Sequence, residues 1–151
     1  MEANNLLRFS LSVEQQLKWL ALVTCPRFGI QSYFKLKSLL PQPLEVFSLS
    51  KRELPNYGLQ SKQINYLSNP DWGYLQTQLD CLISQQVQLI PIEHPAYPTL
   101  LKNISRPPLL LFVKGKISLL NQPQLAFVGS RNPTSYGCQV TQYLVKVIGE
   151  A

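Results

Sequence analysis

The sequence lacks the residue patterns that most often accompany metal binding or catalysis. Its 151 residues include three cysteines without a CxxC pair and a single histidine, so neither a disulfide framework nor a zinc site is predicted. No acidic residue occurs between Glu93 and Glu150. Because acid–base catalysis needs a carboxylate or a comparable group beside the reacting bond, this stretch offers little to an enzyme.

Long hydrophobic runs are also absent. The longest purely apolar run covers residues 109–113, which is far shorter than the roughly 20 residues that span a bilayer. The first ten residues, MEANNLLRFS, lack the basic region and apolar core of a signal peptide. Together with cysteines that are expected to be reduced, these absences predict a cytoplasmic protein with no membrane partner.

Positive charge is concentrated toward the C-terminus. The chain has 14 Lys and Arg against 8 Asp and Glu, a formal net charge of +6. Residues 1–93 contain eight basic and seven acidic residues, whereas residues 94–151 contain six basic and one acidic residue. The charge therefore predicts an anionic partner that binds to the C-terminal third.

Residues 1–86 have the pattern of a helical domain. Apolar residues follow helical spacing over 12–24, 30–40 and the segment after Asp71, with proline-containing breaks between them. Ser12 with Gln15 forms a capping-box pattern, and Asp71 is a typical N-cap. These signals predict several short helices that pack around one apolar core.

A seven-residue pattern, P-x-[FY]-G-[IL]-Q-S, occurs at residues 26–32 and again at 55–61. Each copy lies between two helical patterns, and its glycine is expected to supply the positive φ of a tight turn where the next helix begins at once. This layout is typical of helix-hairpin-helix or SAM-like domains. Such hairpins can point helix amides at a phosphate, but the low net charge of the segment favours hairpins that only pack together.

After residue 86 the pattern changes to short apolar runs at 87–92, 109–115 and 124–129. Continuous apolar runs are typical of strands that are buried on both faces of a parallel sheet. A helical pattern follows, with Val140 and Ile148 on its apolar face. The predicted fold class is α + α/β, with a helical domain at residues 1–86 and the first part of a Rossmann-like parallel-sheet domain at 87–151.

The loop after the third run is the candidate binding site. Gly129 would let the backbone approach a ligand, Ser130 offers a hydroxyl and an amide, and Arg131 can bind phosphate oxygens in bidentate fashion. A helix expected to begin near Thr134 or Ser135 would add the positive end of its dipole. The local pattern is equally compatible with a plain strand-to-helix turn whose arginine lies in solvent. It is not G-x-G-x-x-G, so no dinucleotide cofactor is predicted.

The order of these segments resembles the DNA-processing protein A family, also called DprA or Smf. The resemblance covers the whole chain, in detail over residues 94–137 and only in architecture before residue 87. The matching pieces are His94-Pro95-Ala96-Tyr97-Pro98 with Leu100 and Leu101, Arg106-Pro107-Pro108 leading into Leu111-Phe112-Val113-Lys114-Gly115, and Val128-Gly129-Ser130-Arg131 with Tyr136-Gly137.

This resemblance implies a single-stranded DNA-binding protein of natural transformation, which protects incoming strands and loads the RecA recombinase without being an enzyme. It implies no cofactor and no metal. Gly129, Ser130 and Arg131 match the family positions that hold the DNA backbone. Possible accessory DNA contacts are Asn132, Ser135, Tyr136 and Lys114.

Family members are longer than this chain and are expected to form homodimers. The chain is therefore expected to be an N-terminal fragment that lacks the partner lysine of the pocket, the self-association surface and the RecA contact. The alternative is a Rossmann-like nucleotide hydrolase related to the phosphoribohydrolases, which would need a carboxylate near the loop. A third possibility gives the helical domain a purely protein-binding role.

Four isolated residues receive structural interpretations. His94 is expected in the turn before Tyr97, without a catalytic or metal-binding role. Trp19 and Trp72 are expected in the core rather than as platforms for stacked bases. Cys138 lies near a helix N-terminus, where a thiolate is favoured, but it has no general base nearby and is expected only to pack.

Overall fold

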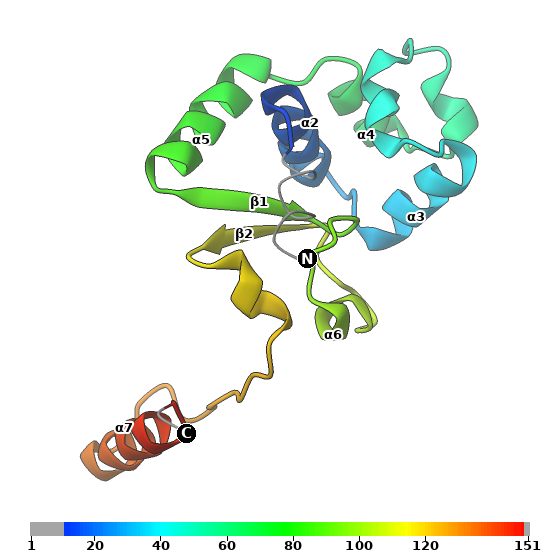
Figure 1. The fold of residues 1–151 in the computed structure, drawn as a ribbon. Coiled ribbons are helices and arrows are strands. Elements are labelled where there is room, and N and C mark those ends of the chain that lie inside the picture. Colours follow the sequence, from blue (N-terminus) through cyan, green and yellow to red (C-terminus); the bar gives the residue numbers. More distant parts are fainter. Residues whose placement is uncertain (1–10, 150–151) are drawn as a thin grey trace, which may run out of the picture. The chain divides into compact units, whose positions relative to one another are not determined.

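The computed structural model of the chain describes residues 11–149. The chain forms two compact units, Met1–Asn121 and Gln122–Ala151 (Figure 1). The first unit combines helices with a small two-stranded sheet, so the observed class is α+β. The predicted domain boundary between residues 86 and 87 stays a prediction.

The first unit begins with a succession of short helices around a shared core. They are α2 (Val13–Thr24), α3 (Ile30–Leu39), the 3-10 helices η2 (Pro43–Ser48) and η3 (Leu54–Tyr57), α4 (Ser61–Leu67) and α5 (Trp72–Ser84). The helical segments predicted at 12–24, at 30–40 and after Asp71 are confirmed, and each of the two 3-10 turns has a proline in its first two residues. The core cluster includes side chains from these helices and from the sheet.

Helix α2 is fixed at its start by the predicted capping box. The Gln15 amide donates to Ser12 Oγ at 3.2 Å, and the Ser12 amide donates to Gln15 Oε1 at 3.0 Å. Residues 19–22 of this helix are buried. Two otherwise unpaired amides are thereby satisfied at the point where the apolar face begins.

Helix α5 begins at the predicted N-cap, because the Tyr74 amide donates to Asp71 Oδ1 at 2.9 Å. Trp19 is 4% exposed, which confirms its place in the core. The same expectation is wrong for Trp72, which is 39% exposed and makes an edge contact with Phe47. Trp72 is the first residue of its helix, so only part of its ring reaches the core.

Two of the three predicted strands form the sheet of the first unit. Strands β1 (Val87–Pro91) and β2 (Leu110–Lys114) pair along their full length, with Val87 opposite Lys114. The connection carries the one-turn helix α6 (Thr99–Lys102), and β2 is followed by η4 (Ile117–Asn121). The core face of the sheet is supplied mainly by β1, where residues 89–91 are buried.

The pairing of β1 and β2 is antiparallel, so the expectation of parallel pairing is wrong for these two strands. A parallel pair needs a long crossover that packs on the sheet, whereas a turn at residues 93–97 and the short α6 return the chain in the opposite direction. Burial in β2 alternates, and Phe112 is 53% exposed. An apolar run therefore does not mean burial on both faces here.

The second unit contains helix α7 (Ser135–Gly149) and the segment that precedes it. The helix is confirmed where the apolar spacing predicted it. The third predicted strand, at residues 124–129, has no regular secondary structure. A strand needs a partner for its backbone groups, and no other strand is described in residues 122–149.

The two copies of the repeat adopt similar turns, but in a register that the sequence does not reveal. In the second copy Gly58 has φ +70, as predicted, whereas in the first copy the residue with positive φ is Arg27 at +58 and Gly29 is extended. The prediction for Gly29 is therefore wrong. In each turn, the left-handed residue precedes a buried apolar residue, Phe28 or Leu59, then an extended N-cap.

The structural repeat thus equates Arg27 with Gly58, whereas the sequence pattern equates Gly29 with Gly58. The next helix begins three residues after the left-handed residue in both turns, at Ile30 and at Ser61. The expected start directly after the glycine is correct for α3 and wrong for α4. In both turns the left-handed residue is followed by a buried apolar residue and an extended N-cap, although only the second turn has a glycine at the left-handed position.

Candidate phosphate-binding loop

The candidate loop leads into a well-capped helix. Helix α7 begins at Ser135, one of the two starting residues that the sequence predicted. The Gly137 amide donates to Thr134 Oγ1 at 3.1 Å, and the Cys138 amide donates to the Thr134 carbonyl at 3.0 Å. Thr134 is therefore the N-cap, which sequence reasoning placed only approximately.

Gly137 makes room for this cap. A Cβ at this position would lie 3.3 Å from Thr134 Oγ1, which is closer than a methyl group and a hydroxyl oxygen normally approach. The absence of a side chain at Gly137 thus leaves space for the threonine hydroxyl that caps the helix.

Ser130 closes a tight turn within the loop. Its hydroxyl accepts from the Asn132 amide at 3.2 Å and donates to the Asn132 carbonyl at the same distance. Such a serine turn orients the intervening residue without a backbone ladder. The backbone amides of Ser130 and Arg131 make no hydrogen bond within residues 11–149.

The loop and the start of α7 surround a hollow of about 720 Å³. The residues around it are Phe127, Val128, Gly129, Ser130, Asn132, Pro133, Thr134, Gly137, Cys138, Thr141 and Gln142. Gly129, Ser130 and Asn132 are thus brought together as predicted site residues. No heavy atom lies within 4 Å of the position that a Cβ of Gly129 would occupy. A ligand could therefore approach the backbone of Gly129.

The other predicted site residues lie differently. Arg131 is exposed, does not line the hollow and makes no ion pair within the described residues. Ser135 and Tyr136 begin α7, and the Tyr136 side chain is 76% exposed. Lys114 belongs to the first unit, where it is the last residue of β2.

The electrostatics of the second unit favour an anion at the loop. The helix dipole places partial positive charge at the start of α7, and no Asp or Glu is among the residues that line the hollow. Ser130, Thr134 and Thr141 supply hydroxyls, although Thr141 donates to the Gly137 carbonyl at 2.9 Å. The arrangement can hold a phosphate, and its lining offers no carboxylate for acid–base chemistry.

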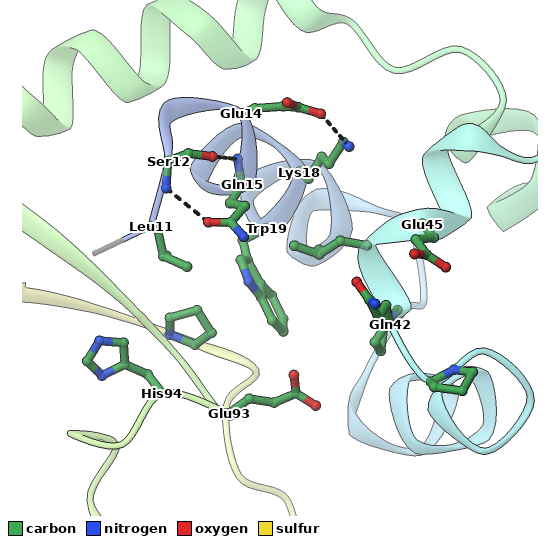
Figure 2. Close-up of a pocket in the computed structure, with 14 residues that line it drawn as sticks. Leu11, Ser12, Glu14, Gln15, Lys18, Trp19, Gln42, Glu45, Glu93 and His94 are labelled. Atoms are coloured by element: carbon green, nitrogen blue, oxygen red, sulfur yellow. Dashed lines mark hydrogen bonds and ion pairs between the residues drawn. The ribbon is translucent and has the colours of Figure 1, made fainter. Parts of the chain in front are cut away.

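A second hollow, of about 590 Å³, lies in the first unit (Figure 2). It is formed by the start of α2, residues 41–45 and residues 91–94 at the end of β1. Trp19 and His94 lie on its wall with several carboxylates (Figure 2). No local sequence pattern reveals this hollow, because its lining comes from three segments that are far apart in the chain.

Much of the charge around this second hollow is already paired. Lys18 and Glu14 form an ion pair at 2.6 Å on one turn of α2, and Lys37 of α3 pairs with Glu93. The ion pair lowers the pKa of the Glu14 carboxyl. These contacts stabilise the wall, and they leave no nucleophile with an adjacent base.

His94 occupies the turn that was predicted for it. Its Nδ1 accepts from the Ala96 amide at 3.0 Å, and its carbonyl accepts from the Tyr97 amide at 2.9 Å. The neutral tautomer compatible with this bond carries its proton on Nε2. Tyr97 in turn donates its hydroxyl to the Pro108 carbonyl at 2.7 Å, which ties this turn to the segment before β2.

Tyr33 is the one buried side chain among the described residues whose polar atom has no hydrogen-bond partner. Burial, and to a lesser extent the nearby Glu93 carboxylate, raise the pKa of its hydroxyl. Its ring packs against Trp19 with centroids 5.7 Å apart. The hydroxyl therefore stays protonated behind the wall of the second hollow.

The three cysteines are free. Cys25 is buried, and burial raises the pKa of its thiol to about 12, whereas Cys81 and Cys138 are exposed. Among the described residues, no three His, Cys, Asp or Glu side chains gather in a group that could hold a metal ion. Over the same residues, no helix has the length and apolar character needed to cross a membrane.

Comparison with known proteins concerns the C-terminal part of the chain. The family model described as DNA recombination-mediator protein A matches residues 88–151. The chain is also 46% identical over 65 residues to the protein named "DNA processing protein DprA" from Bacillus subtilis (strain 168). This match covers 42% of the chain and 22% of the relative, so the chain spans only about a fifth of the relative's length.

No solved structure matches the chain significantly. The matched region contains the candidate loop, the capped start of α7 and the His94 turn. The resemblance noted from the motifs is confirmed by both comparisons. Residues 88–151 of this chain are thus similar in sequence to the DNA recombination-mediator protein A family.

Proposed function

We propose that this chain binds single-stranded DNA without sequence preference and holds a phosphate at Gly129, Ser130 and Arg131. The observation that carries the proposal is the turn before α7, in which the backbone amides of Ser130 and Arg131 have no hydrogen-bond partner within residues 11–149. This turn precedes the positive end of α7 and lies inside the region that the family model matches. The curated relative is named as a DNA-processing protein, which agrees with a nucleic-acid ligand.

The chemistry of the loop supports a phosphate as the bound group. Two backbone amides without partners, an exposed guanidinium and a helix N-terminus all favour a negatively charged, oxygen-rich ligand. The absence of a side chain at Gly129 removes steric resistance to a backbone approach. Contacts to phosphate do not read the base, so binding of this kind is independent of sequence.

Base contacts would complete the site. Tyr136 exposes 76% of its side chain one residue into α7, and a stacked base contributes about 1–3 kcal/mol. Asn132 and Ser135 are proposed as further polar contacts to the DNA. Lys114 is proposed as an accessory contact to the DNA backbone. A stacking contact would make single strands bind more tightly than duplexes.

The proposal extends to a longer protein, comparable in length to the curated relative. We propose that residues 1–86 form a helical, SAM-like domain and that residues 87–151 begin a Rossmann-like domain, whose sheet would be completed by further chain. The complete protein would act as a homodimer in natural transformation, protect incoming strands and load the RecA recombinase. It would need no cofactor and would not be an enzyme.

The alternative is a nucleotide hydrolase on a related scaffold. It would need a carboxylate beside the phosphate, and the residues described around the hollow include none. Release of free base or phosphate from nucleoside monophosphates by the purified protein would favour the hydrolase. Tight binding of DNA with no turnover would favour the DNA-binding function.

The test is fluorescence anisotropy with a labelled oligo-dT strand and the whole chain at low salt. Arg131→Gln removes the guanidinium without changing the length of the chain or its helical content. Its matched control is Lys146→Gln, which removes one positive charge from the same unit at the last turn of α7. We expect weaker binding for Arg131→Gln and wild-type binding for the control; equal binding by all three proteins would refute the proposed site.

A further inference from the structure

The first unit separates its charges along the chain. Residues 26–66 contain six basic and two acidic residues, whereas residues 67–93 contain three acidic residues and no basic one. The low net charge of the N-terminal half therefore conceals a strongly basic segment. This segment comprises both copies of the repeat and helices α3 and α4.

The fold brings the two copies of the repeat into direct contact. Gln63 of α4 is 2% exposed, and its Nε2 donates to the Arg27 carbonyl at 3.1 Å and to Ser32 Oγ at 3.4 Å. Its Oε1 accepts from the Gln60 amide at 2.8 Å. The buried side-chain amide of Gln63 thus ties the turn of the first copy to the start of α4, the helix that follows the second turn.

Three basic residues belong to the segments that meet at this junction. Lys35 of α3 lies over the second turn, where its Nζ is 2.6 Å from the position that a Cβ of Gly58 would occupy. Lys62 precedes the tying Gln63, and Arg27 belongs to the turn that Gln63 holds. Arg27, Lys35 and Lys62 are exposed and make no ion pair within the described residues.

The backbone at this junction is also accessible. Helix α3 begins at an N-cap, Gly29, that offers no side-chain hydrogen bond, and no heavy atom lies within 4 Å of a Cβ placed there. Helix amides without a side-chain cap favour an anion. The unpaired cations around them supply a second and independent source of positive potential.

We propose that the repeat face, defined by Arg27, Lys35 and Lys62, is a nucleic-acid backbone site separate from the Gly-Ser-Arg loop. Dispersed cations and open backbone suit successive phosphates along a strand. A protein partner would instead be expected to meet an apolar centre within a polar rim. Phe34, next to Lys35, is 51% exposed, but no large hydrophobic residue within either repeat copy is strongly exposed.

The repeat face also accounts for a difference between the two copies. Their turns are alike in structure, but the left-handed residue occupies a different position of the sequence pattern in each. Each copy needs a left-handed residue, a buried apolar residue and a helix start. In the first copy the left-handed position carries the arginine, and in the second it carries a glycine covered by Lys35. Both turns therefore present a cation by different means.

The test removes two charges from the repeat face and two from elsewhere in the same unit. Lys35→Gln with Lys62→Gln is compared with Lys102→Gln and Arg106→Gln, which are exposed residues outside both proposed sites. All are made in the complete chain, and their folding is compared by circular dichroism and urea unfolding. Binding to labelled oligo-dT and to a duplex of equal length is followed by anisotropy across a salt series.

The proposal predicts that the repeat-face variant binds more weakly, and that its salt slope for oligo-dT falls by about 1.4, the value for two lost phosphate contacts to a single strand. The control pair should keep the wild-type slope. Equal slopes in the two pairs, or an absence of binding by the folded wild type, would overturn it. Loss of binding in Arg131→Gln with the repeat-face variant unchanged would retain the loop and exclude the repeat face.

Discussion

The buried amide of Gln63 allows a quantitative test of how the two repeats are joined. We consider Gln63→Leu, because leucine has a similar volume and leaves no large cavity. The substitution removes the bond from the Gln60 amide at 2.8 Å and the bond to the Arg27 carbonyl at 3.1 Å. The contact with Ser32 Oγ, at 3.4 Å, is long and contributes little.

Two hydrogen bonds of normal length contribute about 0.5–1.5 kcal/mol each. Gln60 and Arg27 are exposed residues, so water can partly replace the lost partners and the full penalty of buried unsatisfied groups does not apply. Leucine regains some apolar burial. We therefore expect Gln63→Leu to lower the free energy of unfolding by about 2 kcal/mol.

The assay is urea unfolding followed by circular dichroism at 222 nm, with linear extrapolation to water. Gln78→Leu is the control, because Gln78 is exposed on α5 and has no partner within the described residues. Its effect should stay within about 0.5 kcal/mol. A Gln63→Leu protein as stable as the control would refute the account of the junction.

Gln63→Glu separates the two halves of the interaction. A carboxylate keeps an acceptor for the Gln60 amide but places a second oxygen against the Arg27 carbonyl, which it cannot bind as a donor. The variant should be destabilised at neutral pH and recover as the pH falls and the carboxyl becomes protonated. Identical stability curves for Gln63→Glu and wild type between neutral and acid pH would contradict this geometry.

Other consequences concern single turns and caps. Gly58→Ala should cost about 1–2 kcal/mol, because φ is +70 there, while Gly73→Ala inside α5 should be neutral or stabilising; equal effects in urea melts would contradict the backbone argument. Asp71→Ala should cost about 1 kcal/mol through the lost N-cap bond, with a thermal melt as the measurement and no shift as the contrary result. Burial raises the pKa of the Cys25 thiol to about 12 from an ordinary 9.0. The stability that depends on the neutral thiol is therefore fully present below pH 9.0 and is lost as the pH rises toward 12. Urea titrations at rising pH should show a decline of up to about 1.4 kcal/mol per pH unit, and Cys25→Ala should reduce it; an unchanged slope would refute the assignment.

The local helix signals could be predicted from sequence because they act within four residues. Ser12 with Gln15, and Asp71 before α5, specify bonds whose two partners are neighbours in the chain. The same holds for the start of α7 at Ser135. Such contacts join neighbours in the chain and need no distant partner, and they agree with the structure.

Features that depend on distant partners were harder to predict. The apolar run at 109–115 specifies neither burial on both faces nor the direction of the neighbouring strand: burial in β2 alternates, and β2 pairs antiparallel with β1. The run at 124–129 shows that an apolar composition alone does not make a strand. The second hollow and the Gln63 junction both join segments that no local pattern connects.

The repeat shows that a shared sequence pattern does not predict which residue of each turn is left-handed. The letters align Gly29 with Gly58, but the backbone aligns Arg27 with Gly58 because burial of Phe28 and Leu59 sets the turn. A sequence pattern marks residue types, and the fold selects among nearby registers by packing. The position of Arg27 on the repeat face follows from that choice and could not be deduced from the motif.

The central claim is that this chain binds nucleic acid through its phosphates, with Arg131 as a ligand. The most direct measurement is the salt slope of oligo-dT binding for wild type, Arg131→Gln and Lys146→Gln, followed by anisotropy. The account predicts salt-sensitive binding and a slope reduced by about 0.7 in Arg131→Gln alone, the value for one phosphate contact on a single strand. Binding by the folded wild type that does not depend on salt, or a slope unchanged by Arg131→Gln, would contradict it.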